Sequence, residues 1–246
     1  MLSRDGGWLR APSVVPDIHL SMTLDAVIFD WGGTLTPWHT VDPLACWLAV
    51  TSDERQAAAL HEAEAAVWAL CRDEHRSATL DHVLDAAALT LTAAQRRAYF
   101  DWWDAHSFTD PAVEPLFQGL NERGLKIGIL SNTIWPRDEH ERIFTRDLVH
   151  SYIDGAVYSS EIEWTKPDPR AFRAAMDAVG VQDPSRAVFV GDRLFDDIFG
   201  AKRAGMRAVH VPHSDIPAWQ STGVVGEPDA VIDGLLDLLQ VIDAWR

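Results

Sequence analysis

Short apolar runs recur along the chain, and segments with a different hydrophobic spacing separate them. The first run, residues 26–29, combines β-branched and aromatic residues and is followed by a pair of glycines. Such a run predicts a strand that is buried on both faces of a parallel sheet. Similar runs predict further strands at residues 125–130, 155–158, 187–190, 207–211 and 230–232.

The segments between these runs have helical spacing. Helices are predicted at residues 113–123, 137–149, 168–179 and 196–204, and Gly124 and Gly205 are suited to end the first and the last of them. Strands that alternate with helices over this length favour an α/β fold, a doubly wound parallel sheet with right-handed crossovers.

Residues 42–106 contain no strand-like run and are rich in helix-forming residues. Breaks near residues 51–53, 77–79 and 91–93 each offer a Ser, Thr or Asp as a helix N-cap, so about four helices are expected. We therefore expect an α-helical insert with two hinges. The predicted parts are a flexible extension at 1–21, a core at 22–40 and 107–246, the insert at 41–106, and hinges at 37–42 and 106–112.

Charge and composition exclude several classes of function. The 246-residue chain has a formal net charge of −16, which disfavours attachment to nucleic acid phosphates or anionic membranes. Cys46 and Cys71 have no metal-ligand spacing, which favours a reduced, cytoplasmic setting. No apolar run approaches the roughly 18 to 20 residues that span a bilayer, and Pro12, Pro16 and Asp17 interrupt the region of a secretory signal. We expect a cytoplasmic protein whose oligomeric state is left open.

Polar residues whose side chains can bind ligands or react follow the predicted strands. They are Asp30 with Gly32, Gly33 and Thr34, then Ser131-Asn132, then Lys166 in a Lys-Pro-Asp-Pro turn, and finally Asp192 with Asp196 and Asp197. Because ligands of open α/β sheets bind at the carboxyl ends of the strands, these residues are expected to converge. Each also has an ordinary interpretation: a turn for Asp30, a helix cap for Ser131, Asp196 or Asp197, and a surface charge for Lys166.

The order and the residues of these four motifs resemble those of the haloacid dehalogenase superfamily of aspartate-nucleophile hydrolases. The resemblance extends over about residues 24–240 and includes the insert, which is similar to the helical cap on that superfamily's Rossmann-like core. It implies a phosphatase in which Asp30 attacks phosphorus, so that an acyl-phosphate divides a difficult hydrolysis into two steps. It also implies a magnesium ion held by Asp30, Asp192, the carbonyl of Gly32 and Asp197, with Lys166 as a catalytic cation and Ser131, Asn132, Gly33 and Thr34 as substrate-binding residues.

One position departs from the family pattern. Gly32 stands where phosphatases of the superfamily carry a second aspartate, the general acid and base, whose loss typically costs about 10²- to 10⁴-fold in rate. Three explanations remain open: a substrate with a good leaving group, a substitute such as His39, or a weak catalyst that binds a phosphorylated ligand or a partner protein.

The 2-haloacid dehalogenases of the superfamily also lack that aspartate, but normally lack the acidic cluster at 191–197. The cluster therefore favours a Mg²⁺-dependent phosphohydrolase acting on a small phosphorylated metabolite. Trp31 and Trp135 directly follow two of the motifs and are the aromatic residues expected to face the substrate.

Overall fold

The computed structural model describes residues 23–37, 41–212 and 226–246. The predicted extension at residues 1–21, His39 and half of the first hinge, residues 38–40, lie outside the described residues.

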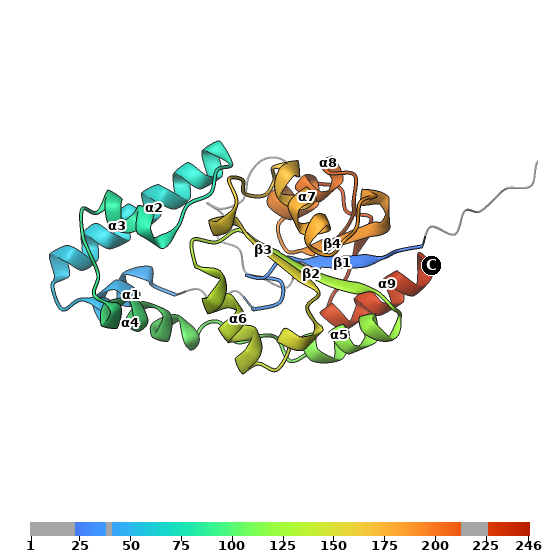
Figure 1. Ribbon diagram of the computed structural model, residues 1–246, viewed down its shortest axis with the longest axis horizontal. Coiled ribbons are helices and arrows are strands. Elements are labelled where there is room, and N and C mark those ends of the chain that lie inside the picture. Colours follow the sequence, from blue (N-terminus) through green and yellow to red (C-terminus); the bar gives the residue numbers. More distant parts are fainter. Residues whose placement is uncertain (1–22, 38–40, 213–225) are drawn as a thin grey trace, which may run out of the picture.

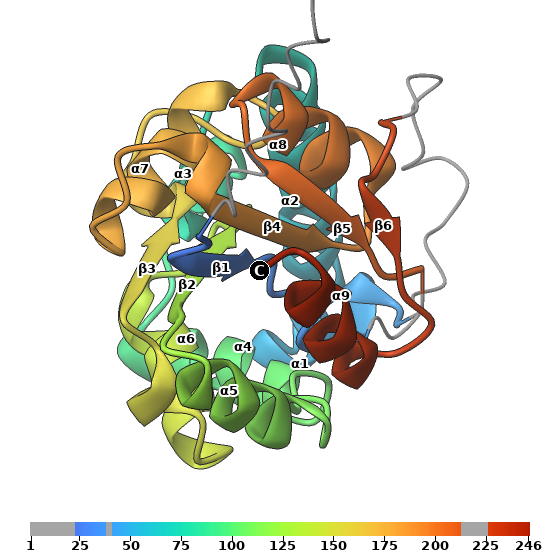
Figure 2. The same cartoon turned by 90° about the vertical axis from the view of Figure 1, so that its right-hand side faces the viewer.

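A parallel sheet of six strands forms the centre of the core (Figures 1 and 2), and its strand order is β3-β2-β1-β4-β5-β6. Every neighbouring pair is parallel. The predicted doubly wound α/β fold is therefore confirmed, and the strand that precedes Asp30 lies in the middle of the sheet. The strands are β1 (Ala26–Phe29), β2 (Lys126–Ser131), β3 (Gly155–Tyr158), β4 (Ala187–Gly191), β5 (Arg207–His210) and β6 (Ala230–Val231).

Helices cover both faces of the sheet (Figure 2). The helices α5 (Val113–Glu122), α6 (Arg137–Arg146) and α9 (Leu238–Ala244) lie on one face, and α7 (Pro169–Ala178) and α8 (Gly200–Arg203) lie on the other. Val27 and Phe29 of β1 pack toward the first group, whereas Ala26 and Ile28 pack toward the second. The unbroken apolar run of β1 is thus explained, because successive side chains enter two different cores.

The prediction for residues 196–204 is wrong in its form. The chain there begins with a wide π-helical segment, Leu194–Phe199, and only then continues as the short α8. The Ile198 amide donates to the carbonyl of Arg193, five residues back, and Asp197 Oδ2 accepts the Arg193 amide at 2.9 Å. This winding turns the Asp197 side chain back toward the end of β4, and wide turns of this kind are frequent at functional sites.

The predicted insert contains the helices α1 (Pro43–Val50), α2 (Glu54–Glu74), α3 (Leu80–Ala86) and α4 (Ala93–Asp104). They begin where the sequence offers N-caps: Asp53 accepts two amide hydrogens of α2, and Thr92 accepts the Gln95 amide of α4. Figure 1 shows these helices beside the core, facing the carboxyl ends of the strands. We call residues 41–106 the cap. The boundaries of cap and core stay predictions.

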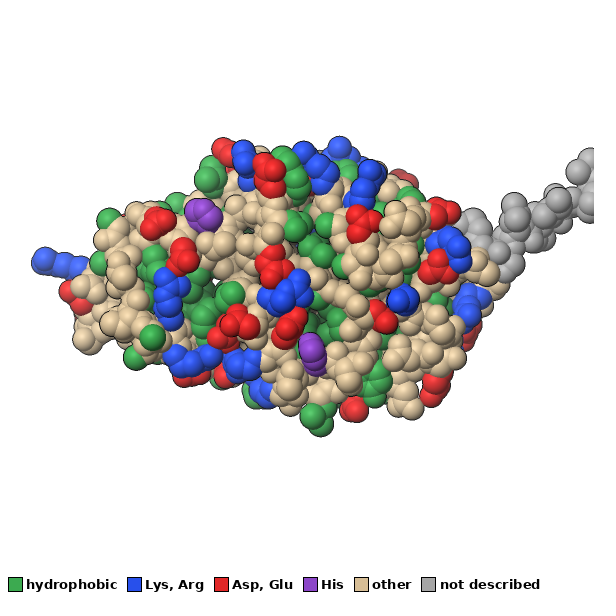
Figure 3. Space-filling model, viewed as in Figure 1, with side chains coloured by type: hydrophobic (Ala, Val, Ile, Leu, Met, Phe, Trp, Pro, Cys, Tyr) green, Lys and Arg blue, Asp and Glu red, His purple; other side chains and the backbone are tan. Residues whose placement is uncertain are grey.

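Ion pairs connect the cap to the core on the face shown in Figure 3, where acidic and basic side chains lie next to one another. Arg97 of α4 pairs with Glu139 of α6 at 2.8 Å, and Asp104 pairs with Arg142 at 2.6 Å. Within the described parts of the chain, no helix combines the length and the apolar character needed to cross a membrane.

Candidate active site

Asp30 follows the central strand directly and is almost completely buried, with 5% of its surface exposed. Its amide donates to the Val190 carbonyl of β4 at 2.9 Å, so the backbone on either side of the sheet centre fixes its position. The chain then turns through Gly33, whose φ is +91°. A Cβ atom at Gly33 would lie 2.3 Å from Asp192 Oδ2, so only glycine allows the turn and this acidic side chain to approach each other.

Thr34 connects two of the predicted acidic residues. Its Oγ1 lies 3.3 Å from Asp30 Oδ2 and 3.4 Å from Asp192 Oδ1, and the residue is fully buried. The hydroxyl proton can serve only one carboxylate at a time. The hydroxyl therefore does little to balance the charge of the two acids.

Lys166 lies among the carboxylates and is as buried as they are. Its Nζ donates to Asp30 Oδ1 at 2.5 Å and to Asp197 Oδ1 at 2.7 Å. These partners raise the pKa of Lys166 against the opposing effect of burial, so the ammonium form is the stable one. The interpretation of Lys166 as a surface charge does not agree with this position.

Asn132 holds the backbone of that lysine. Its Oδ1 accepts the Lys166 amide at 2.8 Å, and its Nδ2 donates to the Lys166 carbonyl at 3.0 Å. The sequence predicted a contact between Asn132 and substrate. In the structure both polar atoms of the side chain are used to orient Lys166.

Three buried carboxylates are brought together at this point. Asp30, Asp192 and Asp197 each offer an oxygen, and these oxygens all lie within 4.8 Å of one another. Burial raises the pKa of Asp30 to about 6 despite Lys166, with repulsion from Asp197 adding to the effect. Burial, followed by the charges of Asp30 and Asp197, also raises the pKa of Asp192 well above its usual range. The donor set suits a small, hard divalent cation.

The Gly32 peptide lies beside this cluster. Gly32 forms a short parallel bridge with Thr36, but the hydrogen bonds of the bridge use the Trp31 carbonyl and the Gly33 amide. The Gly32 carbonyl therefore takes no part in the hydrogen bonds of this bridge. A Cβ atom added at Gly32 would meet no atom of the described residues within 4 Å, so these residues leave open space where the aspartate is missing.

Ser131 ends β2 next to β1, with 2% of its surface exposed, and Thr133 follows in the same loop. The Thr133 amide donates to Ser159 Oγ at 2.8 Å, and Thr133 Oγ1 lies 3.0 Å from His140 Nε2. No pattern in the sequence predicts these partners. They fix the loop that carries Ser131 and Asn132.

Trp31 and Trp135 do not form an exposed aromatic wall. Both are more than nine-tenths buried, and their rings contact each other at a centroid distance of 5.6 Å. The indole of Trp135 also donates to the Tyr99 hydroxyl of the cap at 3.3 Å. The two tryptophans thus form a packed junction between core and cap.

Backbone hydrogen bonds join the cap to the two loops that carry the polar residues. The Leu80 amide donates to the Ile134 carbonyl at 2.9 Å, the Thr165 amide to the His75 carbonyl at 3.2 Å, and the Ser77 amide to the Glu163 carbonyl at 3.1 Å. We call this set of contacts the seam. With the seam formed, Asp30, Asp192 and Lys166 are each at most 5% exposed, so the cluster is shielded from solvent.

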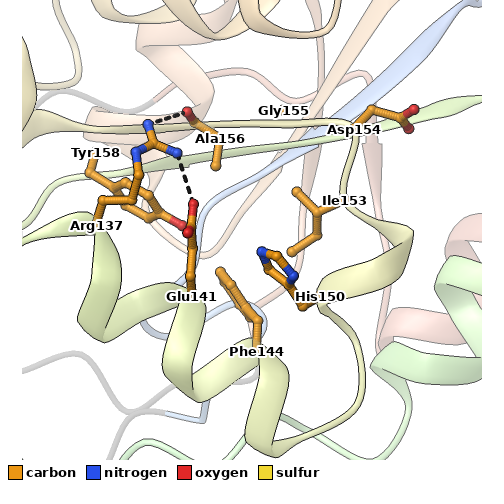
Figure 4. Close-up of a pocket in the computed structure, with 9 residues that line it drawn as sticks. All are labelled: Arg137, Glu141, Phe144, His150, Ile153, Asp154, Gly155, Ala156 and Tyr158. Carbon is orange, nitrogen blue, oxygen red and sulfur yellow. Dashed lines mark hydrogen bonds and ion pairs between the residues drawn. The ribbon is translucent and has the colours of Figure 1, made fainter.

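A cavity of about 190 Å³ lies elsewhere, at the edge of the sheet between β3 and α6 (Figure 4), and contains none of the predicted site residues. Arg137 projects along its wall, where it pairs with Glu141 at 3.1 Å and donates to the Ala156 carbonyl. The charges lining the cavity are thus largely paired with each other. The chemistry of the molecule is concentrated at the carboxyl ends of β1 and β4 instead.

Comparison with known proteins agrees with this placement. The family model of haloacid dehalogenase-like hydrolases matches residues 24–205, which include all four motifs. A glyceraldehyde 3-phosphate phosphatase of Methanopyrus kandleri is 35% identical over 152 residues, which are 62% of this chain and 64% of that protein. The chain therefore matches less than two thirds of that relative's length.

Solved structures share the fold. A HAD phosphatase from Thermococcus onnurineus has a TM-score of 0.64 at 22% identity, over 89% of this chain and 98% of its own. The L-2-haloacid dehalogenase of Xanthobacter autotrophicus also has a TM-score of 0.64, at 17% identity, over 91% and 100% of the two chains. A phosphatase and a dehalogenase thus match the architecture equally well, and the choice between these activities depends on the site.

Proposed function

The chain belongs to the haloacid dehalogenase-like hydrolases, and on this premise we propose that it is a Mg²⁺-dependent phosphohydrolase. Its substrate is a small phosphorylated metabolite, and the reaction passes through an aspartyl-phosphate on Asp30. The phosphatase activity of the relative from Methanopyrus kandleri supports the reaction class.

The proposal rests on the excess of buried negative charge at the site. Three carboxylates within 4.8 Å of one another share a single buried ammonium group, Lys166. A phosphate dianion would be repelled by such a cluster unless a cation reversed the local charge. Asp30, Asp192, Asp197 and the Gly32 carbonyl would hold Mg²⁺, which when bound supplies the charge that attracts and polarises the phosphoryl group.

The residues then have distinct roles. A carboxylate oxygen of Asp30 forms a bond to phosphorus while the bond to the leaving oxygen breaks, and water later releases phosphate from Asp30. Lys166 stabilises the charge on the phosphoryl oxygens and keeps Asp30 ionised. Ser131 and Thr34 offer hydrogen bonds to the phosphoryl group, Gly33 provides the tight turn beside it, and Asn132 acts indirectly by positioning Lys166.

Two other functions remain as alternatives. Gly32 and the likeness to L-2-haloacid dehalogenase favour halide displacement at carbon. However, a metal-free site for a carboxylate substrate gains nothing from three buried acids. A catalytically weak protein that binds a phosphorylated ligand or a partner is the third possibility. The acidic balance of the chain supports a cytoplasmic enzyme that binds small molecules rather than nucleic acid or membranes.

The test is a set of assays on the purified protein with and without Mg²⁺. The substrates are p-nitrophenyl phosphate, acetyl phosphate, a sugar phosphate and a 2-chloro acid, with Asp30→Asn as the control. Mg²⁺-dependent phosphate release that is lost in Asp30→Asn is expected. Metal-independent chloride release would replace the proposal with the dehalogenase function. Mg²⁺ binding without any turnover would favour the binding protein.

A further inference from the structure

The closed site lacks a proton donor at the place where the sequence has Gly32. A Cβ placed at Gly32 would have no atom within 4 Å in the part of the chain that the structure describes. A phosphohydrolase that acts on an ordinary phosphate ester needs a group that protonates the leaving oxygen. The following inference rests on the proposed function and concerns the residue that supplies this proton.

His75 ends α2 in a conformation that its own backbone does not favour. It has φ +53° and ψ +35°, the left-handed region in which helix C-caps are usually Gly or Asn. Histidine at this C-cap position does not stabilise the left-handed turn as Gly or Asn does. A side chain retained in such a conformation suggests a role for the side chain itself.

The contacts of His75 connect it to two loops that carry site residues. Its carbonyl accepts the amide of Thr165, the residue before Lys166, at 3.2 Å. Its ring lies 6.0 Å, between centroids, from the ring of Phe195, two residues before Asp197. His75 is therefore a cap residue in contact with both loops that position Lys166 and Asp197.

A ring nitrogen of His75 is also unused. Nδ1 is buried and has no hydrogen-bond partner among the described residues. Burying a polar nitrogen without a partner is costly, which suggests that a ligand or water meets it during function.

Three other histidines among the described residues have partners of their own. His140 is held by Thr133 and stacks on Tyr158, and burial together with Arg137 lowers its pKa to about 3, so it does not carry a proton at neutral pH. His210 Nε2 lies 3.0 Å from the Asp192 carbonyl. His82 is exposed and bonds the Thr79 amide at the start of α3.

We propose that His75 is the general acid and base of this enzyme, supplied by the cap in place of the aspartate that Gly32 replaces. As the phosphorus–oxygen bond breaks, its electron pair goes to the leaving oxygen, and the imidazolium N–H of His75 gives that oxygen its proton. The neutral imidazole then takes a proton from the water that attacks the aspartyl-phosphate. Phosphate leaves, Asp30 is regenerated as a carboxylate, and His75 is again an imidazolium.

Acidic groups lie near His75. Asp196 follows β4, and the charge of His75 opposes the rise in the pKa of Asp196 that burial causes. Glu163 comes from the loop before Lys166 and pairs with Arg76, the neighbour of His75, at 2.9 Å. Loss of Arg76 alone would therefore disturb the seam without removing the proposed acid.

The test compares His75→Asn with the wild-type protein on two substrates, because Asn also tolerates the left-handed conformation. On a sugar phosphate, whose leaving group needs a proton, kcat is expected to fall about 10²- to 10⁴-fold. On p-nitrophenyl phosphate, whose leaving group needs none, the first-turnover burst of p-nitrophenol is expected to change less than about fivefold. Only the later attack of water on the aspartyl-phosphate, which still needs the base, is expected to slow with this substrate.

The matched controls are His82→Asn, a cap histidine away from the site, and Arg76→Gln, which weakens the seam. The first is expected to have no effect, and the second to affect both substrates alike. Equal losses in the first-turnover rates on both substrates in His75→Asn would overturn the inference, because they would indicate a structural role. An unchanged kcat on the sugar phosphate would overturn it as well.

Rescue provides a further check. Adding Gly32→Asp to His75→Asn is expected to restore turnover of the sugar phosphate, since the space beside Gly32 can hold the new side chain. Restoration confirms that the lost group is an acid, and its absence, in a double variant shown to fold and to hydrolyse p-nitrophenyl phosphate, contradicts this. If the wild-type protein hydrolyses neither substrate, the proposed function fails and the inference falls with it; if only the His75 results fail, the proposed function is unaffected.

Discussion

The molecule buries carboxylates in two regions, and they are stabilised in opposite ways. In the core, Asp30, Asp192 and Asp197 share one lysine. In the cap, Glu64 is a single carboxylate, 8% exposed, that accepts the Trp47 indole N–H at 2.8 Å and the Tyr99 hydroxyl at 3.0 Å.

The difference separates a structural site from a functional one. Both oxygens of Glu64 are satisfied by neutral donors, so the carboxylate fixes the packing of α1, α2 and α4 and needs nothing more. Burial raises the pKa of Glu64, and the hydrogen bonds from Trp47 and Tyr99 oppose this rise. In the core cluster, burial raises the pKa of Asp30 and Asp192, and repulsion between the carboxylates adds to the rise. A cluster of this kind is costly to the fold and is explained by a ligand that neutralises it.

The strongest test of this contrast is Asp30→Asn. If the core cluster is the reactive one, the variant loses at least about 10³-fold in kcat, because an amide cannot attack phosphorus. It is expected to remain folded, since one of the crowded charges is removed. Steady-state kinetics with p-nitrophenyl phosphate and a thermal unfolding curve measure the two effects. Turnover close to that of the wild type would exclude Asp30 as the nucleophile.

Mg²⁺ is expected to stabilise the core cluster and not the cap. At a concentration 100 times its dissociation constant, a ligand specific for the folded state adds about 2.7 kcal/mol to the free energy of unfolding. Asp192→Asn is expected to abolish this gain, whereas Glu64→Gln retains it. Urea unfolding with and without Mg²⁺ measures the difference. Equal stabilisation of all three proteins would show that the ion binds elsewhere.

Replacing the cap carboxylate is expected to change stability and not chemistry. In Glu64→Gln one acceptor becomes a donor and faces the Trp47 N–H or the Tyr99 hydroxyl, at a cost of about 1 to 3 kcal/mol. The kcat on p-nitrophenyl phosphate is expected to stay within a few-fold of the wild type. A loss of activity comparable to that of Asp30→Asn, in a folded variant, would place Glu64 in the reaction.

The smallest effect concerns His140, a buried base between the two regions that contacts Trp31 and Trp135. Burial, aided by the charge of Arg137, lowers its pKa from the ordinary value of 6.5 to about 3. The unfolded chain therefore binds a proton that the folded protein does not. Its contribution to stability is complete above pH 6.5 and is lost as the pH falls toward 3.

The limiting slope of that loss is about 1.4 kcal/mol per pH unit. His140→Phe keeps a ring against Tyr158 and is expected to lose this part of the slope. Urea unfolding of both proteins at pH 7 and pH 5 provides the comparison. Identical pH dependence in the two proteins would mean that His140 is protonated in the folded state.

The sequence predicted the strands and most helices well, because the relevant signals are local. Residues 26–29 carry an unbroken apolar run, and the cap helices begin at residues with side chains that cap them. The π-helical turn at Leu194–Phe199 was not predictable in this way. Its winding depends on a long-range fit, since a Cβ atom at Gly191 would lie 2.4 Å from the Asp197 side chain.

The same distinction applies to the candidate site. Strand ends placed Asp30, Ser131 and Asp192 at one edge of the sheet, and the structure brings Asp30 and Asp192 together there. The use of Asn132 to hold the Lys166 backbone, and the contact of His75 with Thr165, join residues far apart in the sequence. Such pairs have no periodic signal. The roles of the site residues stay predictions until they are tested by substitution.

Hydrogen exchange at the seam can report the motion of the cap. The amides of Ser77, Leu80 and Thr165 each donate across it, so they exchange their hydrogens with solvent only when the cap lifts from the two loops. If the three amides exchange at the same rate, that rate reports how often the cap opens in the absence of substrate. A ligand trapped beneath the cap would slow all three together, whereas one that binds at the sheet edge would leave them unchanged.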